Sequence, residues 1–596
     1  MSARLDHVRT NCTSRAARAR NSCNFFGTSR VLYRATRKSK GQDGEHGAFV
    51  LCHWRRKLFN GSHVRRLLVG MKGKYSSFGR VAYRNTCAPR GNAGGSLTRM
   101  HLRLAIALAL SGCAVGPNFK PPLPPATDAY AGEVLPTQTE ATGVAGGEAQ
   151  HFQFGHDLSG QWWTLFGSTR LDALIHEAME NYPDIVAQQA ALRAARENVR
   201  AQEGVFFPQI QGAGNGEREQ VSGASIGPGF PGFIANIYQA NVNVSYTFDV
   251  FGGERRAVEG LQAQALAQNF KLQASYLTLT SNVASTAIQL ASVRDQIATT
   301  REIIALEDKQ LTIIERQFEL GSQTRADVLQ QQSNLASVRA TLPALQQQLA
   351  VAEHQLAVLT GHFPHDAARA EFSLSDLKLP QDLPVSLPSS LVAQRPDIKT
   401  QEMMLRQTSA AIGVATANML PQLTLTGAFG DESLNFASLL KRGSNTWSLA
   451  AGITQPLFQG GTLRAKRRAA IDAYDQATAQ YRLIVLQAFQ NVADTLTALD
   501  NDAQALKAEY DAVNAAKASL DLIQKQYDDG AVNYVSLLTA QQTYQQARVA
   551  YVRAVASRYT DTVTLFQALG GGWWNRNDNG TLQAVSSAAR SSGTQN

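Results

Sequence analysis

Three features are scarce in this sequence of 596 residues: cysteine beyond its first segment, charge, and long apolar runs. Cys113 is the only cysteine after residue 99, which excludes a disulfide framework there. Charged residues make up only 17% of the chain, so its helices should have polar but weakly charged outer faces, as suits a wall around water. The body contains no run of 18 apolar residues, which excludes a membrane-spanning helix. Crossing a membrane would then require a closed barrel.

The basic character of the chain is confined to its first 99 residues. They hold 21 Lys and Arg against 3 Asp and Glu, a net charge of +18, whereas the whole chain carries +10. The remainder is therefore −8, so nucleic-acid binding is not implied for it. Four cysteines of the first segment lack the paired Cys-x-x-Cys spacing of zinc sites: Cys12, Cys23, Cys52 and Cys87. We interpret residues 1–99 as an upstream extension that results from a misassigned start.

The second half of the remaining chain repeats the first. Pro183-Asp184-Ile185 returns as Pro396-Asp397-Ile398, and Gly252-Gly253 returns as Gly460-Gly461. Near the end of each half, Arg316-Gln317-Phe318 corresponds to Lys525-Gln526-Tyr527. A unit of about 210 residues is too long for a solenoid repeat and indicates a duplicated half-domain. We place the first repeat at 171–380 and the second at 381–570.

Each repeat contains short stretches in which apolar and polar residues alternate, as in a strand with one apolar face. One stretch covers 238–250, its counterpart covers 447–454, and each is preceded by another strand that begins after Pro208 or Pro421. Aromatic residues lie near both ends of the apolar face over 238–250, as in membrane strands of roughly 9–11 residues. The sequence predicts four membrane strands per chain, too few to close a barrel alone. For any one stretch, a strand of a soluble sandwich is the alternative.

Each repeat also predicts a very long helix. Apolar residues of the first repeat fall seven apart at Val283, Leu290, Ile297, Ile304, Leu311 and Phe318. Sustained heptads indicate supercoiled helices, here of roughly 67 residues, on the order of 100 Å, from each Gly-Gly pair to Gly321 or Gly530. Shorter helices are predicted over 324–359 and 534–569, and before the strands over 171–205 and 391–419. The fold class is thus mainly α with a small β part; a dimeric structural coiled coil is the alternative.

An export signal follows the basic segment. Met100 and Arg103 precede an apolar run over 104–110, and Leu110-Ser111-Gly112-Cys113 follows. Small residues before a cysteine match the bacterial lipoprotein signal, in which the thiol is lipidated and becomes the mature N-terminus. We predict a signal peptide over 100–112, lipidation of Cys113, a linker over 113–170, and a flexible tail over 571–596.

Several motifs together resemble the outer membrane factors of tripartite efflux pumps, in the NodT-like lipoprotein branch of the TolC/OprM class. They are Cys113-Ala114-Val115-Gly116-Pro117-Asn118-Phe119, Trp162-Trp163, Arg395-Pro396-Asp397-Ile398, Leu420-Pro421-Gln422-Leu423 and Ala568-Leu569-Gly570-Gly571-Gly572-Trp573. The resemblance covers 113–576 and implies a homotrimeric α/β-barrel, whose helical part extends from the outer membrane into the periplasm. It also implies three partners: outer-membrane lipid, a periplasmic adaptor protein, and an inner-membrane transporter of the resistance-nodulation-division (RND) type.

The same resemblance assigns the helix turns to periplasmic tips that bind the adaptor. The predicted contact residues are Phe318, Gly321, Leu329, Tyr527, Gly530 and Leu538. It also places a gate at the second tip, formed by Tyr527, Val535, Thr539 and Gln542. In some members an acidic and a basic residue pair there, but Thr539 and Gln542 are uncharged, so this ion-pair lock is absent. The two glycines have a structural alternative, because they permit the positive φ that ends a helix.

No catalytic constellation stands out, since the histidines are scattered and no Ser/His/Asp spacing occurs. The sequence predicts no enzyme, no cofactor and no metal site. It predicts the outer-membrane channel of an RND-type efflux pump, a passive duct for drugs or other small molecules. A type I secretion duct for proteins and a lipid-anchored coiled-coil scaffold are the alternatives. A passive duct takes its substrate choice from the pump, so the cargo is not predicted.

Overall fold

The computed structural model describes residues 114–127, 129–130, 136–365 and 372–576. Every described residue belongs to one compact unit, Asn92–Asn596. The extension predicted over 1–99, the signal peptide over 100–112, and Cys113 lie outside the described residues. So does the predicted tail from residue 577 onward.

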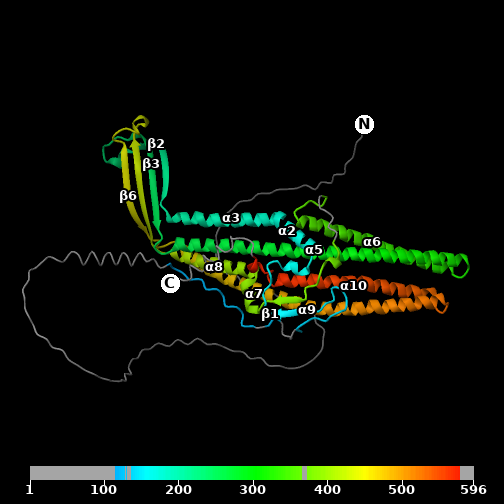
Figure 1. Ribbon diagram of the computed structural model, residues 1–596. Helices are drawn as coiled ribbons and strands as arrows, with labels where there is room; N and C mark the ends of the chain where they lie inside the picture. Colours follow the sequence, from blue (N-terminus) through cyan, green and yellow to red (C-terminus); the bar gives the residue numbers. More distant parts are fainter. Residues whose placement is uncertain (1–113, 128, 131–135, 366–371, 577–596) are drawn as a thin grey trace, which may run out of the picture. The chain divides into compact units, whose positions relative to one another are not determined.

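Two long helices run through the described part of the chain (Figure 1). α5 (Gly253–Glu319) and α9 (Thr462–Asp528) have 67 residues each, as the sequence predicts. Each follows a glycine with positive φ, 76° at Gly252 and 85° at Gly461, which turns the chain from a strand into the helix. α6 (Arg325–Leu359) and α10 (Tyr534–Ala568) have 35 residues each and run back along them. These four helices are confirmed.

The helices before the strands differ from the prediction, because each is broken at the repeated Pro-Asp-Ile motif. The helix expected over 171–205 is two helices, α2 (Thr169–Asn181) and α3 (Pro183–Glu203). The helix expected over 391–419 is α7 (Pro388–Gln394) and α8 (Pro396–Ala417). A residue before proline avoids the helical region, and proline cannot donate the helical hydrogen bond. Tyr182 and Arg395 accordingly have extended ψ values of 120° and 127°.

Four strands form one antiparallel sheet in the order β2-β3-β5-β6. They are β2 (Gln209–Val221), β3 (Phe233–Phe248), β5 (Gln422–Ser433) and β6 (Asn445–Thr454), at the four places where strands are predicted. The register pairs Gly212 with Val242, Val242 with Phe429, and Phe429 with Trp447. Within the described chain, β2 and β6 are each paired along one side only, so the sheet has two open edges.

Two further strands and several short turns are not predicted by the sequence. β1 (His151–Phe154) and β4 (Asp382–Val385) pair in parallel and join the segment before the first repeat to the start of the second. The remaining short elements are η1 (Trp162–Phe166), η2 (Gly204–Phe206), α4 (Gly223–Ile226), η3 (Leu374–Asp376), η4 (Phe436–Ser438) and η5 (Trp573–Asn575).

Part of the linker predicted over 113–170 is packed into the core. Trp162, Trp163 and Phe166 are fully buried, and Trp162 packs against Phe566 of α10 with ring centroids 5.5 Å apart and the rings tilted by 49°. Arg558 of α10 is also fully buried and donates hydrogen bonds to the carbonyl of Gly146, at 3.2 Å, and to two side-chain oxygens nearby. Residues 571–576, the first part of the predicted tail, also contact the helices. Trp573 Nε1 donates to the carbonyl of Gln394 at 2.7 Å.

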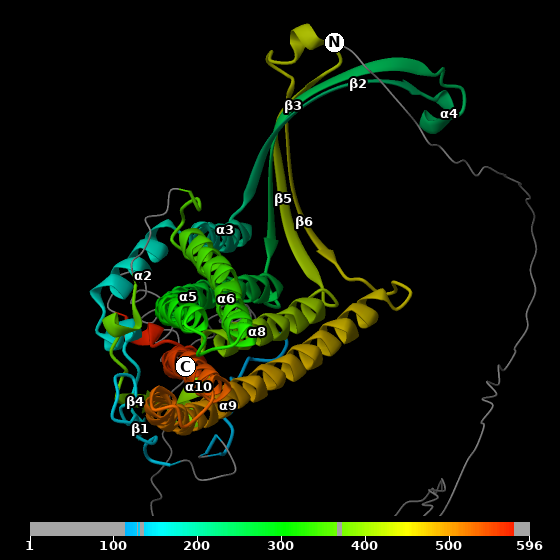
Figure 2. The ribbon, with the colours of Figure 1, turned by 90° about the vertical axis from the view of Figure 1, so that its right-hand side faces the viewer.

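The helices form a layer with α5 in its middle. α5 packs against α3, α6, α8 and α10, whereas α9 packs against α8 and α10 (Figure 2). Within the described chain, the outer sides of α3 and α6 at one edge, and of α9 at the other, have no helix against them. None of the described helices contains an apolar stretch suited to crossing a membrane.

Candidate functional site

The two hairpin turns, α5–α6 and α9–α10, are built in the same way. In the first, the backbone N–H of Gly321 donates to the carbonyl of Phe318 at 2.9 Å, and Ser322 donates to Gln317 at 2.9 Å. Gly530 and Ala531 repeat both bonds in the second turn. This pair of bonds ends a helix with one residue at positive φ, here 78° at Gly321 and 74° at Gly530. The two glycines predicted as tip residues therefore form the turns themselves.

A small apolar cluster holds the two turns together. Its buried members are Ile314, Val328, Tyr534, Leu537 and Leu538. Leu538 is only 4% exposed, so it stabilises the tip from inside and does not offer the adaptor-contact surface predicted for it. Phe318 and Leu329 are 40% and 51% exposed and do lie on the surface of the first hairpin.

The structure divides the four predicted gate residues between two faces of the second hairpin. Tyr527 and Gln542 face the first hairpin: the Tyr527 hydroxyl donates to Gln317 Oε1 at 3.0 Å and accepts from Gln323 Nε2 at 2.8 Å. Gln542 Nε2 donates to Asn334 Oδ1 at 2.8 Å. Val535 and Thr539 instead line an open groove of about 470 Å³ between α9 and α10. The Thr539 hydroxyl donates to the carbonyl of Val535 in its own helix, at 2.9 Å.

A buried carboxylate that the sequence analysis missed lies at the centre of the contact between the hairpins. Glu307 of α5 is 2% exposed. It accepts hydrogen bonds from Gln331 at 2.7 Å and Asn334 at 2.8 Å, both on α6, and from Gln545 on α10. Glu307 thereby ties three helices together, with amide groups rather than a cation as partners.

Further polar contacts continue this pattern along both sides of Glu307. Towards the strands, Arg548 Nη2 donates to Glu302 Oε2 at 2.7 Å and Arg553 Nε to Gln296 Oε1 at 3.0 Å. Towards the tip, the Tyr534 hydroxyl donates to Gln331. We call this row of contacts the polar seam; its residues are Gln296, Glu302, Glu307, Gln317, Gln323, Gln331, Asn334, Tyr527, Tyr534, Gln542, Gln545, Arg548 and Arg553.

One sequence signal could have found Glu307. Three positions after each residue of the heptad row of α5 the chain carries an uncharged residue, except at Glu307; these residues are Thr286, Val293, Thr300, Ile314 and Gly321. Glu307 stands three positions after Ile304, where an uncharged residue is expected. A carboxylate at such a position needs hydrogen-bond partners inside the helix layer.

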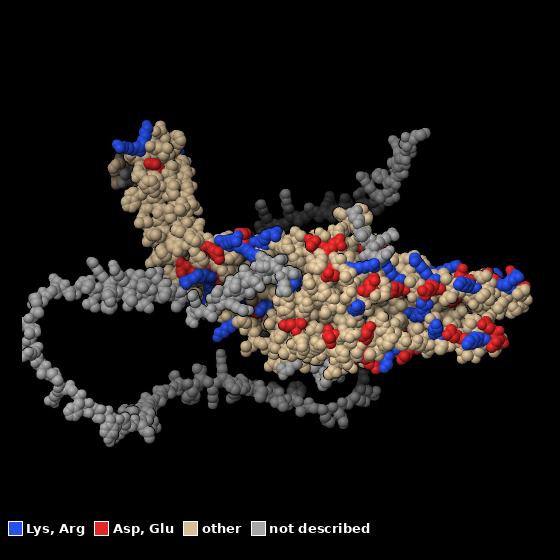
Figure 3. Space-filling view, in the orientation of Figure 1, with Lys and Arg blue, Asp and Glu red and all other residues tan. Residues whose placement is uncertain are grey.

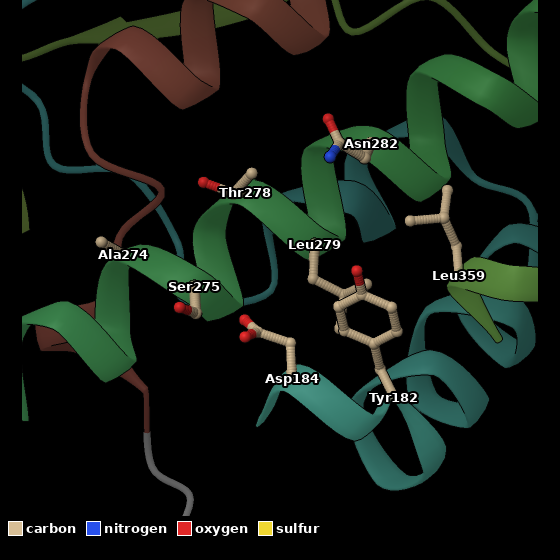
Figure 4. A pocket seen from close by; sticks show the side chains of 8 residues that line it. All are labelled: Tyr182, Asp184, Ala274, Ser275, Thr278, Leu279, Asn282 and Leu359. Atoms are coloured by element: carbon tan, nitrogen blue, oxygen red, sulfur yellow. The ribbon is translucent and has the colours of Figure 1, made fainter. Parts of the chain in front are cut away.

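A separate pocket of about 220 Å³ lies beside the break between α2 and α3. Figure 4 shows Tyr182 and Asp184 from that break facing Ser275, Thr278 and Leu279 of α5. The pocket offers one carboxylate among hydroxyl and amide groups, which is not an acid–base pair. The described residues include no group of three His, Cys, Asp or Glu side chains that could hold a metal ion.

Comparisons with known proteins agree with this architecture. The sequence model of the family described as outer membrane efflux protein matches twice, at residues 174–362 and 387–571. Outer membrane protein OprJ of Pseudomonas aeruginosa is 28% identical over 473 residues, which cover 79% of this chain and 95% of OprJ. The toluene efflux pump outer membrane protein TtgC of Pseudomonas putida is 28% identical over 492 residues, 82% of this chain and 99% of TtgC.

Solved structures of outer-membrane channels have the same fold. The outer-membrane channel OprN superposes with a TM-score of 0.68 at 25% identity, covering 77% of this chain and all of OprN. The CmeC channel of Campylobacter jejuni superposes with a TM-score of 0.70 at 22% identity, covering 80% of this chain and 98% of CmeC. Since the family's sequence model also covers more than half of the residues, the chain belongs to the outer membrane efflux protein family.

Proposed function

We propose that the chain is one protomer of a trimeric duct through which small molecules leave passively across the outer membrane. The observation that carries this proposal is the pair of open edges. Unpaired backbone groups of β2 and β6 would be costly in lipid. Joining β6 and α9 of one copy to β2, α3 and α6 of the next pairs both the strands and the helices, so a ring of copies leaves no edge.

The side chains on the edge helices support this assembly. Leu483 and Leu486 on α9 are 54% and 60% exposed, and Val351 and Val358 on α6 are similarly exposed. Apolar side chains in such numbers on unpartnered helices favour a protein interface. The family resemblance gives the number of copies as three.

The tips support the proposed partners. Phe318 and Leu329, together with the groove at Val535 and Thr539, offer apolar surface for a periplasmic adaptor, which would join the duct to an RND transporter in the inner membrane. Relatives named for efflux of toluene and antibiotics and for pyoverdine export favour small molecules as cargo. They make the protein-secretion duct the weaker alternative.

We further propose that the polar seam is where the duct changes width. The seam consists of hydrogen bonds, which water can replace when the surfaces part. Parting the hairpins at the turns would also expose the small apolar cluster that holds them together, so the seam lowers the cost of separation without removing it.

Planar-bilayer recording and native mass spectrometry test the proposal. The full chain is expected to give a detergent-stable trimer and discrete ion conductance. A coiled-coil scaffold would give no conductance, and a stable monomer with pore activity would contradict closure by three copies. Lipidation of Cys113 is tested separately, by the intact mass of the purified protein.

A further inference from the structure

The end of the sheet next to the helices marks one level of the molecule, which we call the foot of the sheet (residues 249–253 and 455–461). β3 and β6 both run antiparallel to β5, so they end on the same side of the sheet. α5 and α9 begin a few residues after these ends, at Gly253 and Thr462. Figures 1 and 2 show both helices starting there.

The sheet above the foot has the surface of a lipid-facing element. β3 and β6 contain no charged residue, and Trp447, Leu449 and Ile453 of β6 are 74%, 70% and 75% exposed. In Figure 3 charged atoms gather at the far end of the sheet and from the foot onward along the helices, with hardly any between. An uncharged exposed band bordered by charge fits a membrane strand and its two interfaces.

At the start of α5, the cations at the foot have partners inside the chain. Arg255 Nε contacts Asp249 Oδ2 at 3.2 Å. Arg256 is buried, and its Nη1 contacts Glu259 Oε2 at 2.7 Å. This junction therefore presents little unneutralised positive charge.

At the start of α9, the corresponding junction is different. Arg464, Lys466, Arg467 and Arg468 are all exposed, and no carboxylate of the described chain lies within salt-bridge distance of them. Arg467 Nε reaches only the hydroxyl of Thr416, at 3.3 Å. Just before the helix, Leu457 and Phe458 are 92% and 90% exposed. We call these six residues the α9 collar.

The height of the collar fits one headgroup layer. Residues 464 to 468 span about 6 Å of helix axis at 1.5 Å per residue. The headgroup layer on each side of a bilayer is of similar thickness, since a core of about 30 Å becomes about 40–45 Å with the headgroups. The start of the described chain also lies at the foot of the sheet, because the N–H of Val115 donates to the carbonyl of Phe251 at 2.9 Å. Val115 is two residues after Cys113, the predicted site of lipidation.

We propose that the α9 collar binds the phosphates of anionic phospholipids in the leaflet facing the helices, with Leu457 and Phe458 among the acyl chains. This inference rests on the proposed position of the sheet in the membrane. The other candidate occupant is the α3 edge of a neighbouring copy. The last three turns of α3 carry Arg193, Arg196 and Arg200 against Glu197 and Glu203. Glu197 is already paired with Arg200 at 2.6 Å, so that edge offers little negative charge.

The test uses the purified full chain and phosphatidylglycerol as the probe. Arg464→Gln, Lys466→Gln and Arg468→Gln are combined, and Arg467 is kept because it bonds Thr416. Lys309→Gln, Lys517→Gln and Lys525→Gln together form the control, which removes the same charge from the long helices well away from the foot. Native mass spectrometry measures phosphatidylglycerol retained per trimer against phosphatidylethanolamine. We expect the collar variant to retain phosphatidylglycerol about fivefold more weakly for each charge removed, roughly 100-fold in all. The control should retain as much phosphatidylglycerol as the wild type.

Three results would overturn the proposal. Equal retention by the collar variant and the control would show that these cations do not bind lipid. Dissociation of the collar variant into monomers, in lipid-free detergent, would show that they face a neighbouring copy. Displacement of phosphatidylglycerol by equimolar inorganic phosphate would indicate a free-anion site. If the wild-type chain itself formed no trimer or showed no conductance, the proposed duct would be refuted instead. Failure of the lipid site and failure of the duct are therefore distinguishable.

Discussion

Gln545→Met tests the polar seam at the hydrogen bond between Gln545 and Glu307. Methionine keeps the length of the side chain and removes its amide, so no unpaired donor remains on α10. Glu307 then keeps its bonds from Gln331 and Asn334 on α6 but loses its bond to α10. A hydrogen bond to a charged group stabilises by about 1.5–3 kcal/mol. Removing it should shift the equilibrium between joined and separated hairpins by roughly 10- to 150-fold in each protomer.

Arg548→Met is the matched control, three residues along the same helix. It removes the ion pair between Arg548 and Glu302. The Glu302 side chain is 62% exposed, so water screens this pair. Such exposed pairs contribute about 0–1 kcal/mol. Conductance of the purified protein in planar bilayers is the assay, with thermal unfolding as a check on folding. We expect Gln545→Met to raise the open fraction strongly and Arg548→Met to leave it close to wild type. Equal effects of the two substitutions would refute the argument that burial makes Glu307 the strongest contact of the seam.

Three further predictions concern other parts of the chain. Cys113→Ser should abolish the lipid-dependent mass increase but leave conductance intact, because in the proposed duct the sheet itself anchors the trimer; loss of pores would show that the lipid is needed for insertion. Val535→Asp should raise conductance by placing three like charges at one tip, and unchanged conductance would show that Val535 is not at the constriction. Burial and, after it, the neighbouring Asp561 raise the pKa of Asp502 to about 7, against the opposing charge of Arg558. Because the folded chain then binds this proton more tightly than the unfolded chain, the melting temperature should fall as pH rises from about 4 to about 7. Asp502→Asn should flatten that slope, whereas the exposed Asp494→Asn should not.

The parts of the fold that the sequence predicts well are those with a local signal. Gly252 and Gly461 mark the starts of the long helices, and Gly321 and Gly530 mark their ends, so the lengths of α5 and α9 follow from glycine positions. The alternation of side chains likewise locates the four strands of the sheet. Recognition of the family, with its outer-membrane location and efflux function, is confirmed by the comparisons.

The errors arise where two local signals compete or where a contact is distant in sequence. The apolar pattern over 171–205 continues through Pro183 with the spacing of one helix. This spacing therefore predicts a single helix, although proline breaks it into two. Leu538 has the same apolar character as Leu329, and only packing against Ile314 and Val328 shows that it is buried. Glu307 takes its partners from α6 and α10, up to 238 residues away, which no local pattern specifies.

The two hairpin tips correspond in sequence but differ in their contacts. Phe318 and Tyr527 are counterparts in the two repeats, yet they differ by one hydroxyl group. The Tyr527 hydroxyl bridges Gln317 and Gln323 of the opposite hairpin turn, whereas Phe318 is exposed and can make no such bond. The two tips are therefore not equivalent: hydrogen bonds join the second hairpin to the first within the chain, and apolar surface remains on the first for another molecule. Between the two turns the chain therefore has both hydrogen bonds, which water can replace, and one small apolar cluster, which it cannot replace without cost.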